Sequence, residues 1–396
     1  MSTASDPGVH DVLAPEPGAP SGASADELVG AAERLAADVL APAAQATDQA
    51  PQVPGSHLRA LADAGLCGLL GPVDHGGHDA SPAITRQVFE ALAGACGVTF
   101  FVWVQHHAPV RLLAASANAD LRERWLADMC RGSVLGGVAF AYLRRPGLPA
   151  MVARPAPGGW VVAGEAPYVT SWGMARLFAV AAVVEGNGDG SEGDGGGQAI
   201  FFLLDAEVAG PSVRASPPLR LAAMGASATV RLAFDGLFVP DGDVVRTIDL
   251  DQWRARDGAA TSQPHPAAFG LAATAIGALA RRARQSGQAA VDEAAGELAE
   301  ELEACRARSY GLSDLGRDGD VHLAALVEAR AWGLDLAMRS AQAFVAATGG
   351  AAMALDNPAQ RLVRGTAFWS IQAQSSSLRV ASLRTVSAVR RNLRSP

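Results

Sequence analysis

Residues 158–245 decide the fold of this chain. They open with GGWVVAGEAPYVTSW (158–172) and close with MGASATVRLAFDGLFVPDGDVV (224–245). Between these stretches run LFAVAAVVE (177–185) and AIFFLLD (199–205). Short runs rich in β-branched and aromatic residues, bounded by Gly and Pro, are typical of β-strands. The sequence before and after them favours helices, so we expect a small β domain set between two helical regions.

The composition excludes several classes of function. With 396 residues, of which 49% are hydrophobic, the chain is long enough for two or three domains. The formal net charge is −8, so we expect neither nucleic acid nor an anionic membrane as a partner. The sequence contains no lysine, which excludes the usual P-loop ATPases and Schiff-base or pyridoxal chemistry.

The cysteines and the ends of the chain indicate a cytoplasmic protein. The four cysteines make no CxxC pair, so we expect neither a metal site nor a disulfide framework. They are typical of buried thiols in a reducing compartment. No N-terminal segment resembles a signal peptide, and no apolar run is long enough to span a bilayer.

The predicted domain organisation has four parts. Residues 1–24, rich in Pro, Gly, Ala and Ser, are expected to be a disordered tail. An N-terminal helical domain over 25–132 precedes a middle β domain over 133–246. Within the β domain, the acidic glycine-rich loop 186–197 is expected to be disordered. Residues 247–396 should form a C-terminal helical bundle.

Two helices of the N-terminal domain are informative. Asp26 is a candidate N-cap of the first helix. Residues 98–115 are apolar almost throughout, which predicts a buried helix that carries His106 and His107. Adjacent residues do not share a helix face, so the pair is not expected to bind a metal. One interpretation makes these core and surface histidines; the other places His106 against a ligand.

The C-terminal region is predicted to be an antiparallel bundle of four long helices. After Val245 the sequence predicts a bend. The four helical ranges are 267–283, 289–307, 322–347 and 361–389.

Several motifs resemble those of acyl-CoA dehydrogenases in both order and spacing. Residues 61–77, LADAGLCGLLGPVDHGG, are similar to the N-terminal signature of that family. Tyr-Val-Thr-Ser (168–171) resembles its Trp-Ile-Thr-(Ser/Asn), and residues 348–350 and 357–364 resemble its Gly-Gly…Pro-x-x-Arg segment. The resemblance implies an α+β fold with an N-terminal α-helical domain, a middle β-barrel-like domain and a C-terminal four-helix bundle.

The resemblance also implies FAD as the cofactor. In the family, the first strand continues as Thr-Glu-Pro-Gly-x-Gly-Ser-Asp, which holds the flavin ring and phosphates. Here Arg144 and Arg145 replace the Thr and Glu, and two arginines suit phosphate or carboxylate groups. By resemblance, Thr170 would hydrogen-bond near the flavin N5 and Tyr168 would pack on the ring. The full set of implied cofactor contacts is Tyr142, Leu143, Arg144, Tyr168, Thr170, Ser171, Gly349 and Gly350.

In the family, the segment matching Gly349 and Gly350 meets the cofactor of a neighbouring subunit. The resemblance therefore implies a homodimer or a homotetramer. It also implies an acyl thioester as substrate, carried either by coenzyme A or by an acyl carrier protein, and it leaves the electron acceptor open.

The position of the catalytic base departs from the family pattern. Most members use a Glu in Ile-Tyr-Glu-Gly-Thr to remove the α-proton of the thioester. Counting from the second arginine of the motif, Arg364, this chain has Ala373 at that position. The alternative position of a minority of members falls at or near Ala267, which is not acidic either.

Other residues are candidates for the missing role. Glu165, Asp257 and His265 are candidates for a displaced base. Gln372 and Gln374 are candidates for substrate binding, because an amide orients a substrate but is no strong base.

Three hypotheses follow. The chain is a flavin-dependent dehydrogenase of acyl thioesters, a flavin-dependent monooxygenase or oxidase of the same fold, or a non-catalytic relative that binds an acyl thioester or a partner subunit.

Overall fold

The computed structural model describes the chain except for residues 1–23, 146, 148, 187–196, 317–318 and 393–396. The predicted tail up to residue 23 and most of the predicted acidic loop lie outside the described residues.

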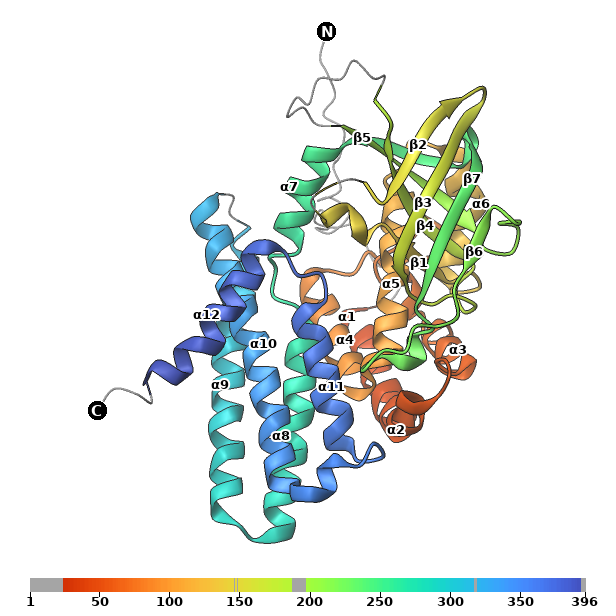
Figure 1. The fold of residues 1–396 in the computed structure, drawn as a ribbon. Helices are drawn as coiled ribbons and strands as arrows, with labels where there is room; N and C mark the ends of the chain where they lie inside the picture. The colour runs from red at the N-terminus through yellow and green to blue at the C-terminus, as the bar shows by residue number, and fades with distance from the viewer. Residues whose placement is uncertain (1–23, 146, 148, 187–196, 317–318, 393–396) are drawn as a thin grey trace.

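Helices build the N-terminal region (Figure 1). Helix α1 (Ala25–Leu35) begins at Ser24, whose hydroxyl accepts a hydrogen bond from the Glu27 amide while the Glu27 carboxylate accepts one from the Ser24 amide. This reciprocal pair is a capping box, so the prediction of Asp26 as N-cap is wrong. After a π-helical turn over Ala36–Leu40, the helices are α2 (Ala41–Gln49), α3 (Gly55–Asp63), α4 (Pro82–Ala95), α5 (Gly97–Ala114) and α6 (Ala119–Arg131).

Helix α5 is the buried centre of this region, as its apolar sequence predicts. None of its residues is exposed, and its aromatic side chains Phe100 and Trp103 are almost wholly buried. It contacts β1 of the middle domain as well as α4 and α6. The helix therefore connects the N-terminal region to the sheet.

A mixed sheet forms the middle of the molecule (Figure 1). Its strand order is β6-β7-β3-β2-β4-β5-β8, with β1 paired parallel to β4. The bounds are β1 (Gly136–Ala139), β2 (Met151–Ala156), β3 (Gly159–Val169), β4 (Leu177–Val184), β5 (Gln198–Asp205), β6 (Val213–Ala215), β7 (Val230–Pro240) and β8 (Val244–Asp249).

The antiparallel pair β3–β7 is the longest in the sheet and ends at an irregularity. Its register shifts between Ala166 and Val169, where Pro167 has no amide to donate to the ladder. Such a shift re-aims side chains. Tyr168 lies within it and is 55% exposed.

The C-terminal region contains two features that the sequence did not predict. Helix α7 (Leu250–Ala260) replaces the expected bend, and the expected fourth helix is divided in two by residues 372–375. The other helices are α8 (Pro266–Ser286), α9 (Ala289–Asp314), α10 (Asp320–Thr348), α11 (Pro358–Ile371) and α12 (Ser376–Asn392).

Helix α7 joins the sheet to the bundle. Its Trp253 is buried in the core of the β domain, where it packs near Phe140 and Phe201. In Figure 1, α7 stands between the sheet and the helices α9 and α10. The helix is therefore held from the sheet side and leads into α8.

The N-terminal region and the bundle meet at a very close helix crossing, α4 against α8. A Cβ atom on Gly270 would lie 2.2 Å from the carbonyl oxygen of Glu90, and one on Gly94 would lie 2.7 Å from the Gly270 carbonyl oxygen. Thr274 adds a hydrogen bond of 2.9 Å to the Gly94 carbonyl. The two helices thus touch through backbone atoms, which only glycine permits here.

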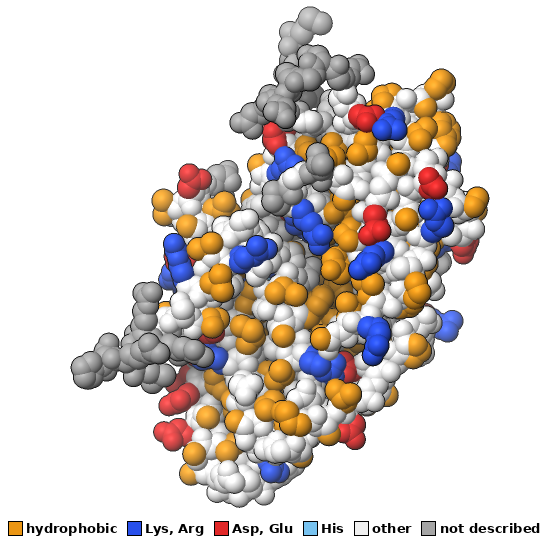
Figure 2. Space-filling model, in the orientation of Figure 1, with side chains coloured by type: hydrophobic (Ala, Val, Ile, Leu, Met, Phe, Trp, Pro, Cys, Tyr) orange, Lys and Arg blue, Asp and Glu red, His pale blue; other side chains and the backbone are white. Residues whose placement is uncertain are grey.

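The surface shows no dominance of one charge on the face in view. Figure 2 shows arginine and acidic side chains interspersed with hydrophobic ones over both the sheet and the bundle. In the part of the chain that the structure describes, no helix combines the length and apolar content needed to cross a membrane.

The close crossing of α4 and α8 gives a stability prediction. Gly270→Ala is expected to destabilise the protein by about 1–3 kcal/mol, because its methyl group would overlap the Glu90 backbone. Gly277→Ala on the same helix is the control. The nearest neighbour of its added methyl group is the flexible Arg281 side chain at 3.6 Å, so the free energy of unfolding should rise by less than about 1 kcal/mol. Equal effects of the two substitutions in denaturant titrations would contradict the crossing.

Candidate functional site at the junction of sheet and bundle

Three buried hydroxyl groups lie at the end of β3. The Thr170 Oγ1 lies 3.2 Å from the Thr229 Oγ1, which lies 2.7 Å from the Ser227 Oγ. All three side chains are at most 6% exposed. Three hydroxyls carry three protons, and the two hydrogen bonds between them use two. One proton therefore remains for an acceptor outside this group.

Ser171 adds an unsatisfied group beside the three hydroxyls. Its backbone has φ +71°, and its amide donates to the Ser227 carbonyl at 2.9 Å. Its buried Oγ has no hydrogen-bond partner among the described residues. A buried polar atom without a partner is rare and often marks the place of a missing ligand or water.

The turn after β1 positions its side chains differently from what the resemblance implied. Tyr142 and Leu143 are buried in the β-domain core. The Tyr142 hydroxyl donates to the carbonyl of Ala181, and burial raises the pKa of this phenol. These two side chains are used by the fold, so any contact of theirs with a cofactor would involve the backbone.

Arg144 and Asp257 form a two-pronged ion pair between this turn and α7. The Arg144 Nε and Nη2 each lie 2.7 Å from one Asp257 oxygen, and the two side chains are 27% and 12% exposed. The neighbouring Arg145 lies over the ring of Tyr168, with its guanidinium carbon 5.6 Å from the ring centroid. In this structure Arg144 is therefore committed to an internal carboxylate, while Arg145 is exposed.

Arg330, which is not among the predicted site residues, is buried next to this pair. Arg330 of α10 is 3% exposed, and it donates to the carbonyls of Thr261 (2.5 Å) and Gln263 (3.3 Å) through Nη1. Its Nη2 donates to the carbonyl of Gln372 at 3.0 Å. Burial lowers the pKa of Arg330 to about 10, helped by the charge of Arg144 and opposed by that of Asp257.

The sequence carried a signal for Arg330. It lies four residues after Leu326 and four before Leu334, on the apolar face of a long helix. An arginine there must be buried, and a buried arginine needs partners.

The loop between α11 and α12 carries the position of the family's base. Ala373 has φ +48°, an unusual value for a residue with a side chain. Gln372 gives its backbone carbonyl to Arg330, while its buried Oε1 has no partner. Gln374 instead donates to the Ser370 carbonyl and accepts from Arg379 of α12. Of the two glutamines, Gln372 is thus the one whose backbone carbonyl is hydrogen-bonded to the buried arginine.

The other candidate bases are placed less favourably. His265 caps α8 by accepting from the Ala267 amide, and its ring lies 4.7 Å from that of Trp369. Desolvation, followed by the charge of Arg330, lowers the pKa of His265 to about 3, so it is a weak base at neutral pH. Glu165 is exposed on β3.

His106 has its hydrogen bonds satisfied by the fold. Its Nε2 lies 3.2 Å from the Cys67 carbonyl and 3.1 Å from that of Met129, and its Nδ1 accepts from the Gly136 amide at 2.8 Å. His107 is buried too, so neither histidine faces outward as one interpretation expected.

Gly349 and Gly350 are exposed in the link between α10 and α11, which in Figure 1 lies at the end of the bundle away from the sheet.

Two groups of site residues thus emerge. Arg144 pairs with Asp257, Arg330 donates to the Gln372 carbonyl, and the charges of Arg144 and Asp257 act on Arg330. Ala226, the neighbour of Ser227 in the chain, belongs to the same apolar cluster as Trp369, whose ring lies 4.7 Å from that of His265. The first group connects the turn after β1 with α7, and α10 with the loop after α11, whereas the three hydroxyls lie just after β3 and just before β7.

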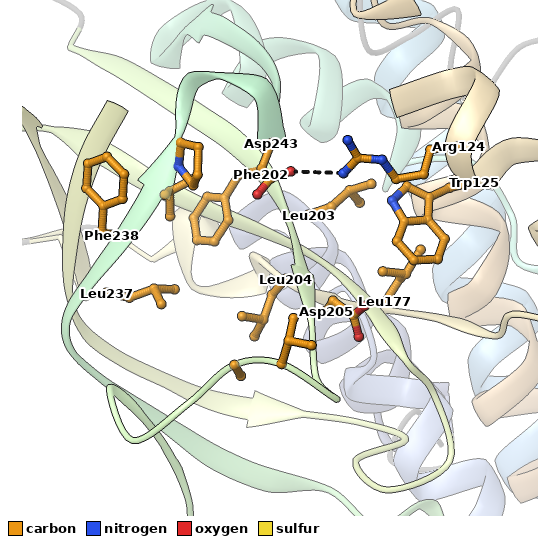
Figure 3. Close-up of a pocket in the computed structure, with 14 residues that line it drawn as sticks. Arg124, Trp125, Leu177, Phe202, Leu203, Leu204, Asp205, Leu237, Phe238 and Asp243 are labelled. Carbon is orange, nitrogen blue, oxygen red and sulfur yellow. Dashed lines mark ion pairs between the residues drawn. The ribbon is translucent and has the colours of Figure 1, made fainter. Parts of the chain in front are cut away.

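Two pockets lie outside this junction. One, with a volume of about 220 Å³, lies between α6 and the sheet and is lined by side chains such as Trp125, Phe202 and Phe238 (Figure 3). Arg124 points across it towards Asp243 at 3.6 Å. The other, of about 200 Å³, lies between α10 and α12 and reaches Ser370 and Gln374.

Comparison with known proteins identifies the class of this fold. Residues 23–133 match the family model described as the N-terminal domain of acyl-CoA dehydrogenases. Benzylmalonyl-CoA dehydrogenase of Aromatoleum aromaticum is 27% identical over 212 residues, which are 52% of this chain and 53% of that protein. The match thus spans about half the length of this relative.

Similarity to solved structures extends over nearly the whole chain. Butyryl-CoA dehydrogenase of Megasphaera elsdenii superposes with a TM-score of 0.75 at 17% identity, covering 92% of this chain and 97% of that one. The FAD complex of PigA has the same TM-score and identity, covering 94% and 99%. At such identities the similarity shows the fold.

These findings confirm the predicted fold class, the acyl-CoA dehydrogenase fold. Together with the match of residues 23–133 to the N-terminal domain model, they show that this chain is similar to acyl-CoA dehydrogenases, as its motifs indicated.

The Arg144–Asp257 pair yields a second stability prediction. Asp257→Asn should destabilise the protein by about 2–3 kcal/mol, because it leaves Arg144 and Arg330 without an anion; the partial exposure of Arg144 reduces the loss. Asp251→Asn, on the same helix, removes only an exposed pair with Arg254 and should change stability by less than about 0.5 kcal/mol. Chemical unfolding of both variants tests the difference, and a mild effect of Asp257→Asn would contradict it.

The buried state of His106 predicts a pH dependence of stability. Burial lowers the pKa of His106 to about 4, below the value near 6.5 expected in the unfolded chain. Its contribution to stability is therefore complete above pH ~6.5 and is lost as the pH falls towards ~4. His106→Gln should reduce the slope of the unfolding free energy with pH in this window by up to about 1.4 kcal/mol per pH unit. Parallel curves for the two proteins would refute this assignment.

Proposed function

We propose that this chain is an FAD-dependent oxidoreductase that acts on an acyl thioester. The proposal rests on the three hydroxyls of Thr170, Thr229 and Ser227, because the two hydrogen bonds between them leave one of their protons for another acceptor. The orphaned Ser171 Oγ supports it, because the edge of a flavin ring offers nitrogen and oxygen atoms to such hydroxyls.

The residues at the junction fit a flavin at its ring end. Thr170 would donate to the ring edge, and Ser171 would complete the polar contacts. Bound FAD would supply the hydride acceptor that no amino-acid side chain provides. Arg145 is exposed and is the arginine of the turn free of an ion pair in the described structure, so we assign it to the phosphates.

The chain lacks an obvious base for the α-proton of the thioester. Ala373 holds the family position, Asp257 is paired with Arg144, and His265 has a pKa of about 3. Loss of a general base lowers a rate by roughly 10²–10⁴-fold. We therefore expect slow dehydrogenation. The buried charged side chain that is hydrogen-bonded to this loop, Arg330, is no base.

Gly349 and Gly350 lie away from the junction, as they would if they served a neighbouring subunit. Met353 and Leu355 of the same segment are exposed by 63% and 65%. We infer that this segment lies at an interface of a homodimer or homotetramer. A flavin-loaded monomer in light scattering would speak against this.

The cofactor is tested directly by purification. The protein should be yellow, with FAD released on denaturation and identified by mass spectrometry, and Thr170→Val should retain less of it at equal folding. Anaerobic bleaching by an acyl thioester supports the dehydrogenase. Rapid reoxidation by oxygen with hydroxylated product would favour the monooxygenase, and a colourless folded protein would leave only thioester or partner binding.

The missing base gives a gain-of-function prediction. Ala373→Glu should raise the rate of flavin reduction by an acyl thioester by about tenfold or more, since it restores a carboxylate at the family position. Ala373→Gln is the control of equal size without the charge and should not raise the rate. Stopped-flow absorbance under anaerobic conditions measures both. No gain in a folded, flavin-loaded Ala373→Glu protein would show that this loop does not face the α-carbon.

A further inference from the structure

We propose that Arg330 binds a free carboxylate on the acyl group, so that the substrates are thioesters of dicarboxylic acids. This inference rests on the proposed function and specifies the substrate class of the same site.

The hydrogen bonds of Arg330 do not pair its charge with an anion. The guanidinium donates to the carbonyls of Thr261, Gln263 and Gln372, which are all neutral acceptors. Its Nε is buried and has no partner among the described residues. An arginine that is only 3% exposed normally meets a carboxylate, because a buried charge is costly without a counter-charge.

The charges around Arg330 sum to a positive excess. Arg144 and Arg330 are both cationic, and Asp257 is the one carboxylate whose charge acts on Arg330 in the described part of the chain. Both oxygens of Asp257 already accept from Arg144. Thr261 caps the C-terminal end of α7, whose partial charge of about −0.5 offsets only part of the excess. An anion is the complement that this cluster lacks.

Gln372 provides a second group for such an anion. Its side-chain Oε1 is buried without a partner, and its backbone carbonyl holds Arg330. Rotation of the amide by 180° presents its NH₂ in place of the oxygen within the same volume. The rotated amide and the Arg330 Nε together offer N–H donors to a carboxylate.

The residue after Gln372 is consistent with this assignment. A glutamate at position 373 would bring a negative charge into the loop that contacts Arg330. Alanine brings none, so the guanidinium stays available for an anion from the substrate. An uncharged residue at position 373 and a buried cation bonded to the same loop are thus both consistent with an anion supplied by the substrate.

Two coenzyme A thioesters of equal chain length test the proposal. Glutaryl-CoA and pentanoyl-CoA both carry five-carbon acyl groups and differ in a terminal carboxylate against a methyl group. Their dissociation constants are measured by calorimetry on the full-length flavin-loaded protein. The wild type should bind glutaryl-CoA about tenfold more tightly or better, the worth of one charge-assisted contact. Equal affinities would overturn the proposal.

Variants assign the preference to Arg330. Arg330→Met should bring the affinity ratio close to one. Arg339→Met is the matched control on the same helix: Arg339 pairs with Glu301 and Asp335, so its removal should leave the ratio unchanged. A preference that survives Arg330→Met, or that is lost equally in Arg339→Met, would refute the assignment.

A third variant keeps the test decisive if Arg330→Met does not fold. Gln372→Leu keeps Arg330 and its backbone contacts and should lower the preference several-fold; an unchanged ratio would contradict the site. Failure of the wider function has a different result. A colourless protein that still prefers glutaryl-CoA loses the flavin but keeps the anion site, whereas a yellow protein bleached equally by both thioesters keeps the function and loses the anion site.

Discussion

A guanidinium buried without a carboxylate must find its hydrogen bonds in the backbone, and Arg330 does so on two other segments. It holds the carbonyls that follow α7 and the carbonyl of Gln372 between α11 and α12. One side chain on α10 thereby fixes the link from sheet to bundle and the loop at the family's base position. The two segments that it holds include irregular backbone, such as the positive φ of Ala373, so these hydrogen bonds help to fix the geometry of the junction.

The regular elements were predictable because their patterns are local. The apolar run of α5 and the β-rich runs around Phe178 and Phe201, bounded by Gly and Pro, can be recognised within their own segments. Helix α7 was missed because it has no apolar stripe; the burial of Trp253 in the β-domain core holds it, and that contact is invisible in sequence. The break at 372–375 contains neither Gly nor Pro, and Ala373 adopts a positive φ only because tertiary contacts hold it there.

The site was predictable in part. The motif around Thr170 indicated the hydroxyls at the end of β3, but the contributions of Ser227 and Thr229 depend on the pairing of β3 with β7. The resemblance gave Arg144 to a ligand, whereas the structure gives it to Asp257 of an unpredicted helix. Arg330 belonged to no motif, so only its place on an apolar helix face could have revealed it. Sequence motifs thus pointed to the hydroxyls beside Thr170 and missed the charges whose positions depend on tertiary contacts.

The backbone contact between Gly94 and Gly270 limits how the molecule can open. Where two helices touch through their backbones, no side chains lie between them that could change rotamer and let the helices slide. We therefore expect α4 and α8 to move as one rigid body. Any opening of the junction must then come from displacement of the sheet and α7 relative to this body. The hinge would lie in the residues that connect α7 to α8, where Thr261 and Gln263 are held by Arg330. The hydrogen bonds of Arg330 to these residues would then oppose that movement, and their strength would set how readily the junction opens.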